Sequence, residues 1–271
     1  MKKRRNIGLA LSGGGARGLA HIGVLKVLQE EKVPIDMIAG ASIGALIGAI
    51  YAQGKDVSVI KKAALELNMK KLVSLADFRL NRTGFIGGRK VGSLLRSIMG
   101  SDVEFSALKI PLACVATDIN NCGEVIITQG SVLEAVRASI SIPGIFTVVK
   151  WQGRYLVDGG LVNPVPVSVL RKMGSDYVIA VNVIPDIHHR VLLADEEVKA
   201  DLKEPHIFSV IVQAIQMAQC LLVKSSIQDA DIIISPNAAH IGFGDFHRAQ
   251  ECIKQGETAA KDSVLEIKKL L

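Results

Sequence analysis

A serine with a glycine two residues away on either side is the leading candidate for a catalytic residue in this sequence. Residues Gly40–Gly44 have the sequence GASIG, which matches G-x-S-x-G between a strand-like segment and a helix-like one. A sharp turn from strand to helix lifts such a serine clear of its sheet, and the glycines avoid clashes within the turn. A helix N-terminus also favours negative charge. Simple helix capping is the alternative interpretation, but glycines on both sides favour a nucleophile at Ser42.

A glycine-rich loop near the N-terminus, GGGARG at Gly13–Gly18, has two interpretations. Gly13, Gly15 and Gly18 fit G-x-G-x-x-G, which binds a dinucleotide pyrophosphate, whereas converging backbone amides would stabilise an oxyanion. The first interpretation requires an acidic residue at the C-terminal end of the second strand. Asp36 lies at the beginning of that segment, and the serine motif occupies its end. The sequence therefore favours an oxyanion site and leaves a phosphate- or nucleotide-binding module as the alternative.

A base must take the proton of the serine hydroxyl before the oxygen can attack. His240 and His247 come late enough to complete a serine, acid, histidine order, but neither lies in a motif. His21 is expected to pack or hydrogen-bond locally. The segment LVDGGLVNPVP, Leu156–Pro166, is a better candidate, because its acid follows apolar strand residues and meets two glycines in a tight turn.

Asp158, the acid of that segment, has a structural and a catalytic interpretation. A turn aspartate commonly hydrogen-bonds its own backbone, whereas the two glycines after it let the chain approach another group closely. A carboxylate is normally a weak base for a serine. Catalysis by Asp158 therefore requires a partly buried site that raises its proton affinity, together with a preorganised oxyanion site.

Three motifs together resemble those of the patatin-like phospholipase family: the glycine loop, the serine motif, and DGG at Asp158–Gly160. The segments ATD at Ala116–Asp118 and RASISIPGIF at Arg137–Phe146 resemble parts of its bacterial members. The resemblance implies an α/β fold with three layers, α/β/α, and a mostly parallel central sheet. It also implies a serine esterase that hydrolyses acyl esters of lipids, such as phospholipids or lysophospholipids, without a metal or other cofactor.

The same resemblance implies a role for each site residue. Ser42 would be the nucleophile that forms an acyl-enzyme, and Asp158 would be the base of a serine and aspartate dyad. Backbone amides of the glycine loop would form the oxyanion hole, and an arginine would hold the loop or add charge: Gly13, Gly14, Gly15, Ala16 and Arg17. A solvent-exposed side chain is the alternative for Arg17.

The elements that would position these motifs alternate between strand and helix, which indicates a parallel sheet with crossover helices. Short apolar segments predict strands, and apolar residues at helical spacing predict helices. The predicted strands are Asn6–Leu11, Ile35–Ala39, Ile110–Ile119, Gly123–Gly130, Asp176–Ile184 and Asp231–Pro236. The predicted helices lie within Gly18–Lys32, Ile43–Ala52, Ser131–Pro143, Ile207–Ile227 and Phe246–Leu271. The polar segment Ile187–Pro205 is predicted to leave the core.

A chain of 271 residues, 49% of them hydrophobic, is long enough to bury one substantial core. We expect a single domain over residues 1–271, with residues 70–100 as a candidate cap or membrane-facing subregion. Met37–Gly54 is an uncharged run of 18 residues, but its glycines and Ser42 favour a buried strand and helix over a membrane span. Four cysteines without C-x-x-C spacing or histidine pairing indicate neither a zinc site nor a disulfide framework.

The net charge of +6 suits acidic partners, and the basic residues are unevenly distributed. Between Lys70 and Arg96, seven basic residues accompany a single acid, with Phe78, Phe85 and Ile86 among them. This mixture suits an anionic membrane surface, although a solvated basic loop has the same composition. No pattern typical of nucleic-acid recognition accompanies the charge.

The basic residues at the N-terminus are followed by a short apolar stretch, which predicts no cleaved signal peptide. We expect a cytoplasmic protein that acts on a lipid or acyl ester, with peripheral contact to an anionic membrane as a further hypothesis. The sequence indicates no particular oligomeric state.

Overall fold

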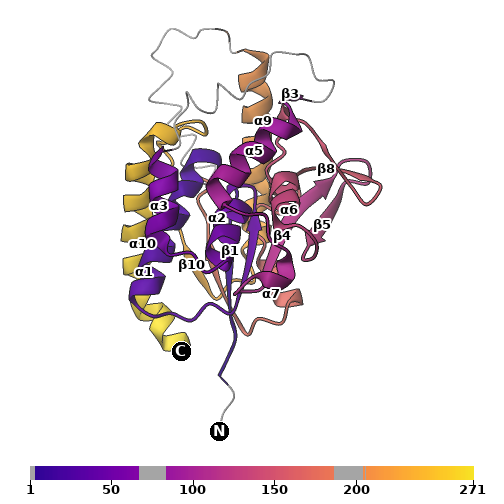
Figure 1. Ribbon diagram of the computed structural model, residues 1–271. Coiled ribbons are helices and arrows are strands. Elements are labelled where there is room, and N and C mark those ends of the chain that lie inside the picture. The colour runs from indigo at the N-terminus through magenta and orange to yellow at the C-terminus, as the bar shows by residue number, and fades with distance from the viewer. Residues whose placement is uncertain (1–3, 67–83, 186–203, 205) are drawn as a thin grey trace.

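The centre of the structure is a sheet of short, apolar and mostly parallel strands (Figure 1). The structure is a computed structural model that describes residues 4–66, 84–185, 204 and 206–271. Five strands run parallel in the order β10-β9-β1-β2-β4. In that order they span Ile232–Ile234, Tyr177–Val181, Ile7–Leu11, Met37–Ala41 and Leu112–Asp118. Every residue of β1, β2 and β4 is buried, as expected for parallel strands covered on both faces.

Three further strands join the large sheet in the antiparallel sense. β5 (Gly123–Ile127) and β8 (Arg154–Asp158) both pair with β4, and β7 (Val149–Trp151) pairs with β8. A separate two-stranded sheet pairs β3 (Gly84–Ile86) with β6 (Gly144–Phe146). The large sheet is therefore mixed. The glycine loop and the serine motif both adjoin strands of its parallel part.

Helices cover both faces of the large sheet, and alternate strand residues face the two helix layers. Leu9 of β1 packs into one apolar cluster and Ala10 into the other. The first cluster includes residues of six helices: α1 (Ala20–Glu30), α2 (Ile43–Ala52), α3 (Val57–Glu66), α5 (Gly88–Met99), α6 (Val132–Ser139) and α10 (Ala249–Leu270). The second includes α7 (Val167–Lys172) and the C-terminal part of α9 (Ile207–Ser226). The predicted three-layer α/β/α fold with a mostly parallel sheet is confirmed.

The strand predicted at Ile35–Ala39 lies two residues later, at Met37–Ala41. Asp36 belongs to the turn before it, where the Asp36 carboxylate accepts a hydrogen bond of 2.8 Å from the amide of Ile7. The difference matters for function, because the strand now ends directly before Ser42.

The helix predicted from Gly18 begins earlier and in a tighter form. Residues Gly15–Leu19 form a 3-10 helix, η1, and the α-helical part starts at Ala20. Part of the glycine loop is therefore helical. η1 packs against α10, which also lies along α1. At that contact Gly256 of α10 lies so close to the carbonyl oxygen of Ala20 that an added β-carbon would approach it to 1.9 Å.

Several elements were not predicted from the sequence, namely α3, α5, the strands β3 and β6 of the two-stranded sheet, and β7 of the large sheet. The predicted excursion at Ile187–Pro205 and most of the basic stretch that starts at Lys70 lie outside the described residues.

None of the helices within the described ranges is both long and apolar enough to cross a bilayer. The uncharged run Met37–Gly54 forms β2 and α2, and both are almost entirely buried. The prediction of a buried strand and helix for this run is confirmed.

Candidate active site

The candidate site lies where two strands end against each other on one edge of β4. β2 runs parallel to β4, and its last residue, Ala41, pairs with Val115. β8 runs antiparallel to β4, and its last residue, Asp158, pairs with Ala116. β5 pairs with both of these β4 residues and occupies the other edge. The carboxyl ends of β2 and β8 therefore meet head-on, which brings Ser42, directly after Ala41, next to Asp158.

The backbone of Ser42 is strained. Its φ of 54° and ψ of −124° fall in a region that residues with a β-carbon rarely adopt. Ser42 is the N-cap residue of α2, yet its hydroxyl makes no capping hydrogen bond. The interpretation of this serine as a simple helix cap is therefore wrong, and the hydroxyl is left for another use.

Two glycines make this turn sterically feasible, as the motif predicts. A β-carbon on Gly40 would lie 2.5 Å from the amide nitrogen of Ala45, and one on Gly44 would lie 2.2 Å from the carbonyl oxygen of Leu11. Both contacts are with backbone atoms, which cannot move aside without disturbing β1 or α2.

Ser139, at the end of α6, fixes the turn from the side of β4. The amide of Ser42 donates to the Ser139 hydroxyl oxygen at 2.9 Å, and that hydroxyl donates to the carbonyl of Val115 at 2.6 Å. Ser139 is fully buried. This brace was missed from the sequence, where nothing distinguishes Ser139 from other helix-terminal serines.

Asp158 is held by its backbone and by the glycine turn that follows it. The Thr117 hydroxyl donates to the carbonyl of Asp158 at 2.8 Å, and the amide of Gly160 donates to carboxyl oxygen Oδ1 at 2.8 Å. The side chain is 1% exposed, and Oδ2 makes no hydrogen bond of standard geometry with a described residue. Asp158 therefore both hydrogen-bonds the backbone of its own turn and buries its carboxyl group.

Burial raises the pKa of Asp158 from its usual 3.8 to about 6. The nearby Ser42 hydroxyl and the hydrogen bond from the Gly160 amide oppose this rise, because both stabilise the ionised form. The Ser42 hydroxyl therefore lies within the reach of the carboxyl. A carboxyl group with this proton affinity is ionised at neutral pH and is a stronger base than a solvated aspartate.

The glycine loop lies directly beside Ser42. A β-carbon on Gly13 would lie 3.4 Å from that of Ser42. The amides of Gly13 and Ala16 are already used, because they donate to the carbonyls of Pro164 (3.0 Å) and Phe243 (2.9 Å).

The amides of Gly14 and Gly15, by contrast, donate to no acceptor in the described part of the chain. The φ angles of these two residues are 144° and 59°, which only glycine adopts readily. Of the five predicted oxyanion-hole residues, Gly14 and Gly15 therefore have the available backbone donors.

Arg17 is buried, with 6% of its surface exposed, so the solvent-exposed alternative is wrong. Its Nε donates to the carbonyl of Ile241 at 2.6 Å, and its Nη1 donates to the side-chain oxygen of Gln216 at 3.3 Å. These bonds tie the glycine loop to the C-terminal region and to α9.

His21, His240 and His247 lie within the described residues. His21 is buried, its Nε2 bonds the carbonyl of Ser12 at 2.9 Å, and burial lowers its pKa to about 4. It is therefore neutral at pH 7 and braces the start of the loop. His240 bonds Glu251 at 2.8 Å, and His247 is exposed. Neither forms a hydrogen bond with Ser42.

The residue that a dinucleotide site would need is engaged elsewhere. Asp36 pairs with Arg4 and bonds the amide of Ile7 at the amino end of β2, whereas the glycine loop and Ser42 lie at the carboxyl end. Within the described ranges, no three or more His, Cys, Asp or Glu side chains gather as metal ligands.

Two buried glutamines of α9 also border the site and were missed from the sequence. Gln216 and Gln219 are 7% and 4% exposed. Gln216 bonds Arg17, and the amide nitrogen of Gln219 lies against Gly160. Gln213 stands three residues before Gln216 and is exposed, so the spacing of these glutamines does not identify the buried face.

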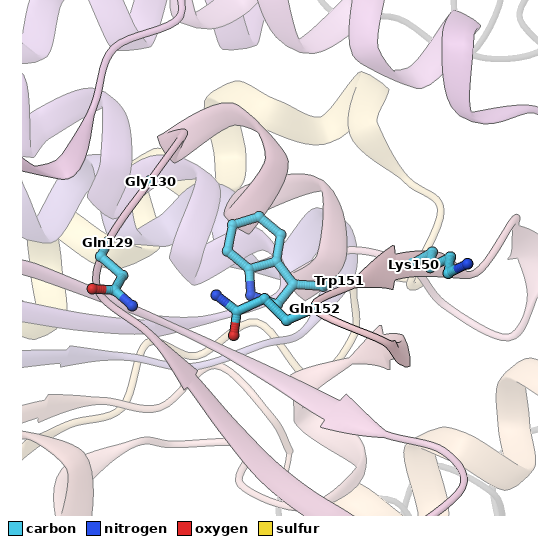
Figure 2. A pocket seen from close by; sticks show the side chains of 5 residues that line it. All are labelled: Gln129, Gly130, Lys150, Trp151 and Gln152. Carbon is cyan, nitrogen blue, oxygen red and sulfur yellow. The ribbon is translucent and has the colours of Figure 1, made fainter.

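A separate pocket lies between the end of β7 and the segment that follows β5 (Figure 2). It is lined by Gln129, Gly130, Lys150, Trp151 and Gln152. Trp151 pairs with Arg154 at the start of β8, and Asp158 ends that strand roughly 13 Å further along at about 3.3 Å per residue. This pocket is not part of the candidate active site.

Comparison with known proteins identifies related sequences. A family model described as patatin-like phospholipase matches residues 9–171. The chain is 37% identical over 183 residues to neuropathy target esterase sws of Drosophila melanogaster, a match that covers 66% of this chain and 13% of that protein. It is 36% identical over 177 residues to an uncharacterized NTE family protein of Mycobacterium bovis, covering 65% of this chain and 49% of that one. The chain thus spans half or less of the length of these relatives.

Two solved structures share the fold. VipD from Legionella pneumophila superposes with a TM-score of 0.52 at 15% identity, covering 97% of this chain and 67% of that chain. The type III effector protein ExoU superposes with a TM-score of 0.52 at 13% identity, covering 98% and 53%. At these identities the likeness concerns the fold alone.

Proposed function

The chain belongs to the patatin-like phospholipase family, and from this premise we propose that it is a serine esterase that hydrolyses carboxylic esters of lipids, such as phospholipids or lysophospholipids. The observation that carries the proposal is the head-on meeting of β2 and β8, which sets a strained serine beside a buried aspartate. The unit that acts is a single domain of this chain, with residues 70–100 as its candidate cap.

The first step is acylation of Ser42. Asp158 accepts the hydroxyl proton while the oxygen attacks the ester carbonyl carbon, and the carbonyl becomes a tetrahedral oxyanion. When this intermediate collapses, the bond to the alcohol breaks and Asp158 returns the proton to the leaving oxygen. The products are an acyl-enzyme and an alcohol or lysolipid.

The second step is hydrolysis of the acyl-enzyme. Water gives a proton to Asp158 and attacks the acyl carbon, and collapse of the second oxyanion returns the proton to the oxygen of Ser42. A carboxyl with a pKa of about 6 can accept and release this proton near neutral pH.

The oxyanion of both steps is stabilised by the glycine loop. The amides of Gly14 and Gly15 are the donors, since those of Gly13 and Ala16 serve the loop itself. The N-termini of η1 and α2 add positive potential near the same point. Arg17 holds the loop through its bonds to Ile241 and Gln216.

Labelling with a fluorophosphonate probe tests this function without presuming a substrate. The wild-type protein should be labelled, Ser42→Ala should not be, and labelling of Asp158→Asn should fall sharply. Ser97→Ala, a change of an exposed helical serine, is the matched control. If folded wild-type protein is not labelled and nucleotides bind it in titration, the nucleotide-binding alternative replaces the esterase.

Contact with a lipid surface is the second part of the proposal. Exposed apolar side chains lie along α9, with exposed fractions of 72%, 63% and 69% at Ile207, Met217 and Leu221. Arg89 and Arg96 of α5 are exposed basic residues. Lys70, Lys71, Arg79 and Arg82 of the same basic stretch lie outside the described residues.

Liposome binding tests this contact. Binding should rise with the fraction of anionic lipid and weaken with salt, because the attraction is screened. Leu221→Gln should weaken binding, whereas Leu265→Gln, at a 76% exposed site on α10, should not. Equal binding to neutral and anionic liposomes at every salt concentration would remove the electrostatic contribution.

A further inference from the structure

Gln219 is a buried polar side chain beside the catalytic turn whose role the mechanism above leaves unassigned. It is 4% exposed and makes no hydrogen bond with any residue that the structure describes. Its neighbour on the same face of α9, Gln216, bonds Arg17 instead. A buried amide is stabilised by a hydrogen-bond partner, and a ligand oxygen beside Gly160 would be such a partner for Gln219.

The turn after Asp158 is shaped around this amide. A β-carbon on Gly160 would lie 2.4 Å from the amide nitrogen of Gln219 and 3.0 Å from Oδ1 of Asp158. A side chain at Gly160 would therefore displace the Gln219 amide from its place beside the turn. The same geometry places that amide on the carboxyl side of the turn.

The proposed mechanism requires an oxygen atom beside the carboxyl of Asp158, in addition to that of Ser42. In acylation Asp158 gives its proton to the oxygen of the leaving alcohol, and in deacylation it takes a proton from water. Proton transfer to the leaving alcohol and proton transfer from the attacking water are the same reaction in opposite directions. The alcohol oxygen and the water oxygen therefore occupy one position beside the carboxyl. An amide group there can donate to the lone pair of that oxygen or accept its second hydrogen.

We propose that Gln219 is a further catalytic residue, which hydrogen-bonds the oxygen that exchanges its proton with Asp158: the leaving alcohol first and the attacking water second. The proposal rests on the proposed esterase function. Gln219 forms no covalent bond and gains no proton. It orients the oxygen, while the proton moves between that oxygen and Asp158.

An activated ester separates this role from a merely structural one. The nitrophenolate of a p-nitrophenyl ester leaves without a proton, so acylation does not need Gln219, whereas the water of deacylation does. With Gln219→Leu we expect a nitrophenolate burst within about threefold of the wild-type rate. Steady-state turnover should fall about 10- to 100-fold, as expected for the loss of one such hydrogen bond, and acyl-enzyme should accumulate in intact-protein mass spectra.

A matched control comes from the same helix. Gln213 is exposed, and Gln213→Leu should leave burst, turnover and fluorophosphonate labelling at wild-type values. With a lysophospholipid substrate, whose alcohol needs a proton to leave, Gln219→Leu should slow acylation as well.

Two outcomes would overturn the inference. In the first, Gln219→Leu slows the burst and the labelling as much as the turnover, which indicates loss of packing. In the second, it changes none of them. Both are distinct from failure of the esterase function itself, in which the wild-type protein shows no burst and no labelling that depend on Ser42.

Discussion

The two strand-end turns of the site make an instructive comparison, because each holds its reactive group in an unfavourable state of a different kind. After β2, Ser42 has a strained backbone and a hydroxyl that caps nothing. After β8, Asp158 has an ordinary φ of −50° but a carboxyl group removed from water. The nucleophile is set by the conformation of its chain, and the base is set by the environment of its side chain.

The magnitudes of these two effects are comparable. Backbone strain of this type costs about 1–3 kcal/mol. The rise in the pKa of Asp158 from 3.8 to about 6 corresponds to about 3 kcal/mol, at about 1.4 kcal/mol for each pKa unit. The packed core offsets both of these free-energy costs of the site.

The largest expected effect concerns the two turns as one catalytic unit. Ser42→Ala and Asp158→Asn should each reduce kcat/KM for an ester by at least about 10³-fold, and the double variant should lose little more, because the residues act together. Initial rates of all three variants measure this. The exposed Asp262→Asn is the control for removal of a carboxylate. Multiplicative losses in the double variant would mean that the two turns act independently.

The pH dependence is the next largest effect and reports on the Asp158 turn alone. The base must be ionised, so kcat/KM should fall about tenfold for each pH unit below an apparent pKa near 6 and level off above it. His240→Ala and His247→Ala should leave this profile unchanged. If either variant removes the activity of a folded protein, a histidine is the base and the comparison of the two turns fails.

Both turns could be found in the sequence from their residues, whereas their meeting was predicted only through the family resemblance. Glycines around Ser42 and after Asp158 are local requirements of tight turns, and such requirements are visible in short motifs. The head-on junction depends on the register of β2 and β8 along β4, which is set by pairings between distant segments. The alternation of elements predicted a parallel sheet with crossover helices, and the family resemblance supplied the three layers.

The partners of the glycine-loop amides and the buried face of α9 could not be predicted either, because they too depend on contacts between distant segments. Gly13 and Ala16 fit the oxyanion motif as well as their neighbours do, yet Pro164 and Phe243 engage their amides from far along the chain. Gln219 lies in an apolar helix whose inward face only the packed structure identifies.

The stability of Asp158→Asn isolates the cost of the buried carboxyl. Because the pKa of Asp158 is raised in the folded state, the wild-type protein loses stability as pH rises from about 4 to 6, and the loss is complete above that. The asparagine does not ionise and keeps an acceptor for the Gly160 amide. The free energy of unfolding of the variant should match the wild type near pH 4 and exceed it by up to about 3 kcal/mol at pH 8. Urea titrations at the two pH values measure this, and an equal difference at both would exclude ionisation as the cause.

The smallest expected effect isolates the cost of the strained backbone after β2. Glycine adopts the φ and ψ of Ser42 with little strain, so Ser42→Gly should raise the free energy of unfolding by about 1 kcal/mol, a value reduced by the greater freedom of glycine in the unfolded chain. Ser42→Ala keeps the β-carbon and should gain nothing, which separates backbone strain from the loss of the hydroxyl. Both differences should be measured at pH 8, well above the pKa of about 6 for Asp158. If alanine stabilises as much as glycine does, the cost lies in the buried hydroxyl and not in the chain, and the two turns would then share one kind of penalty.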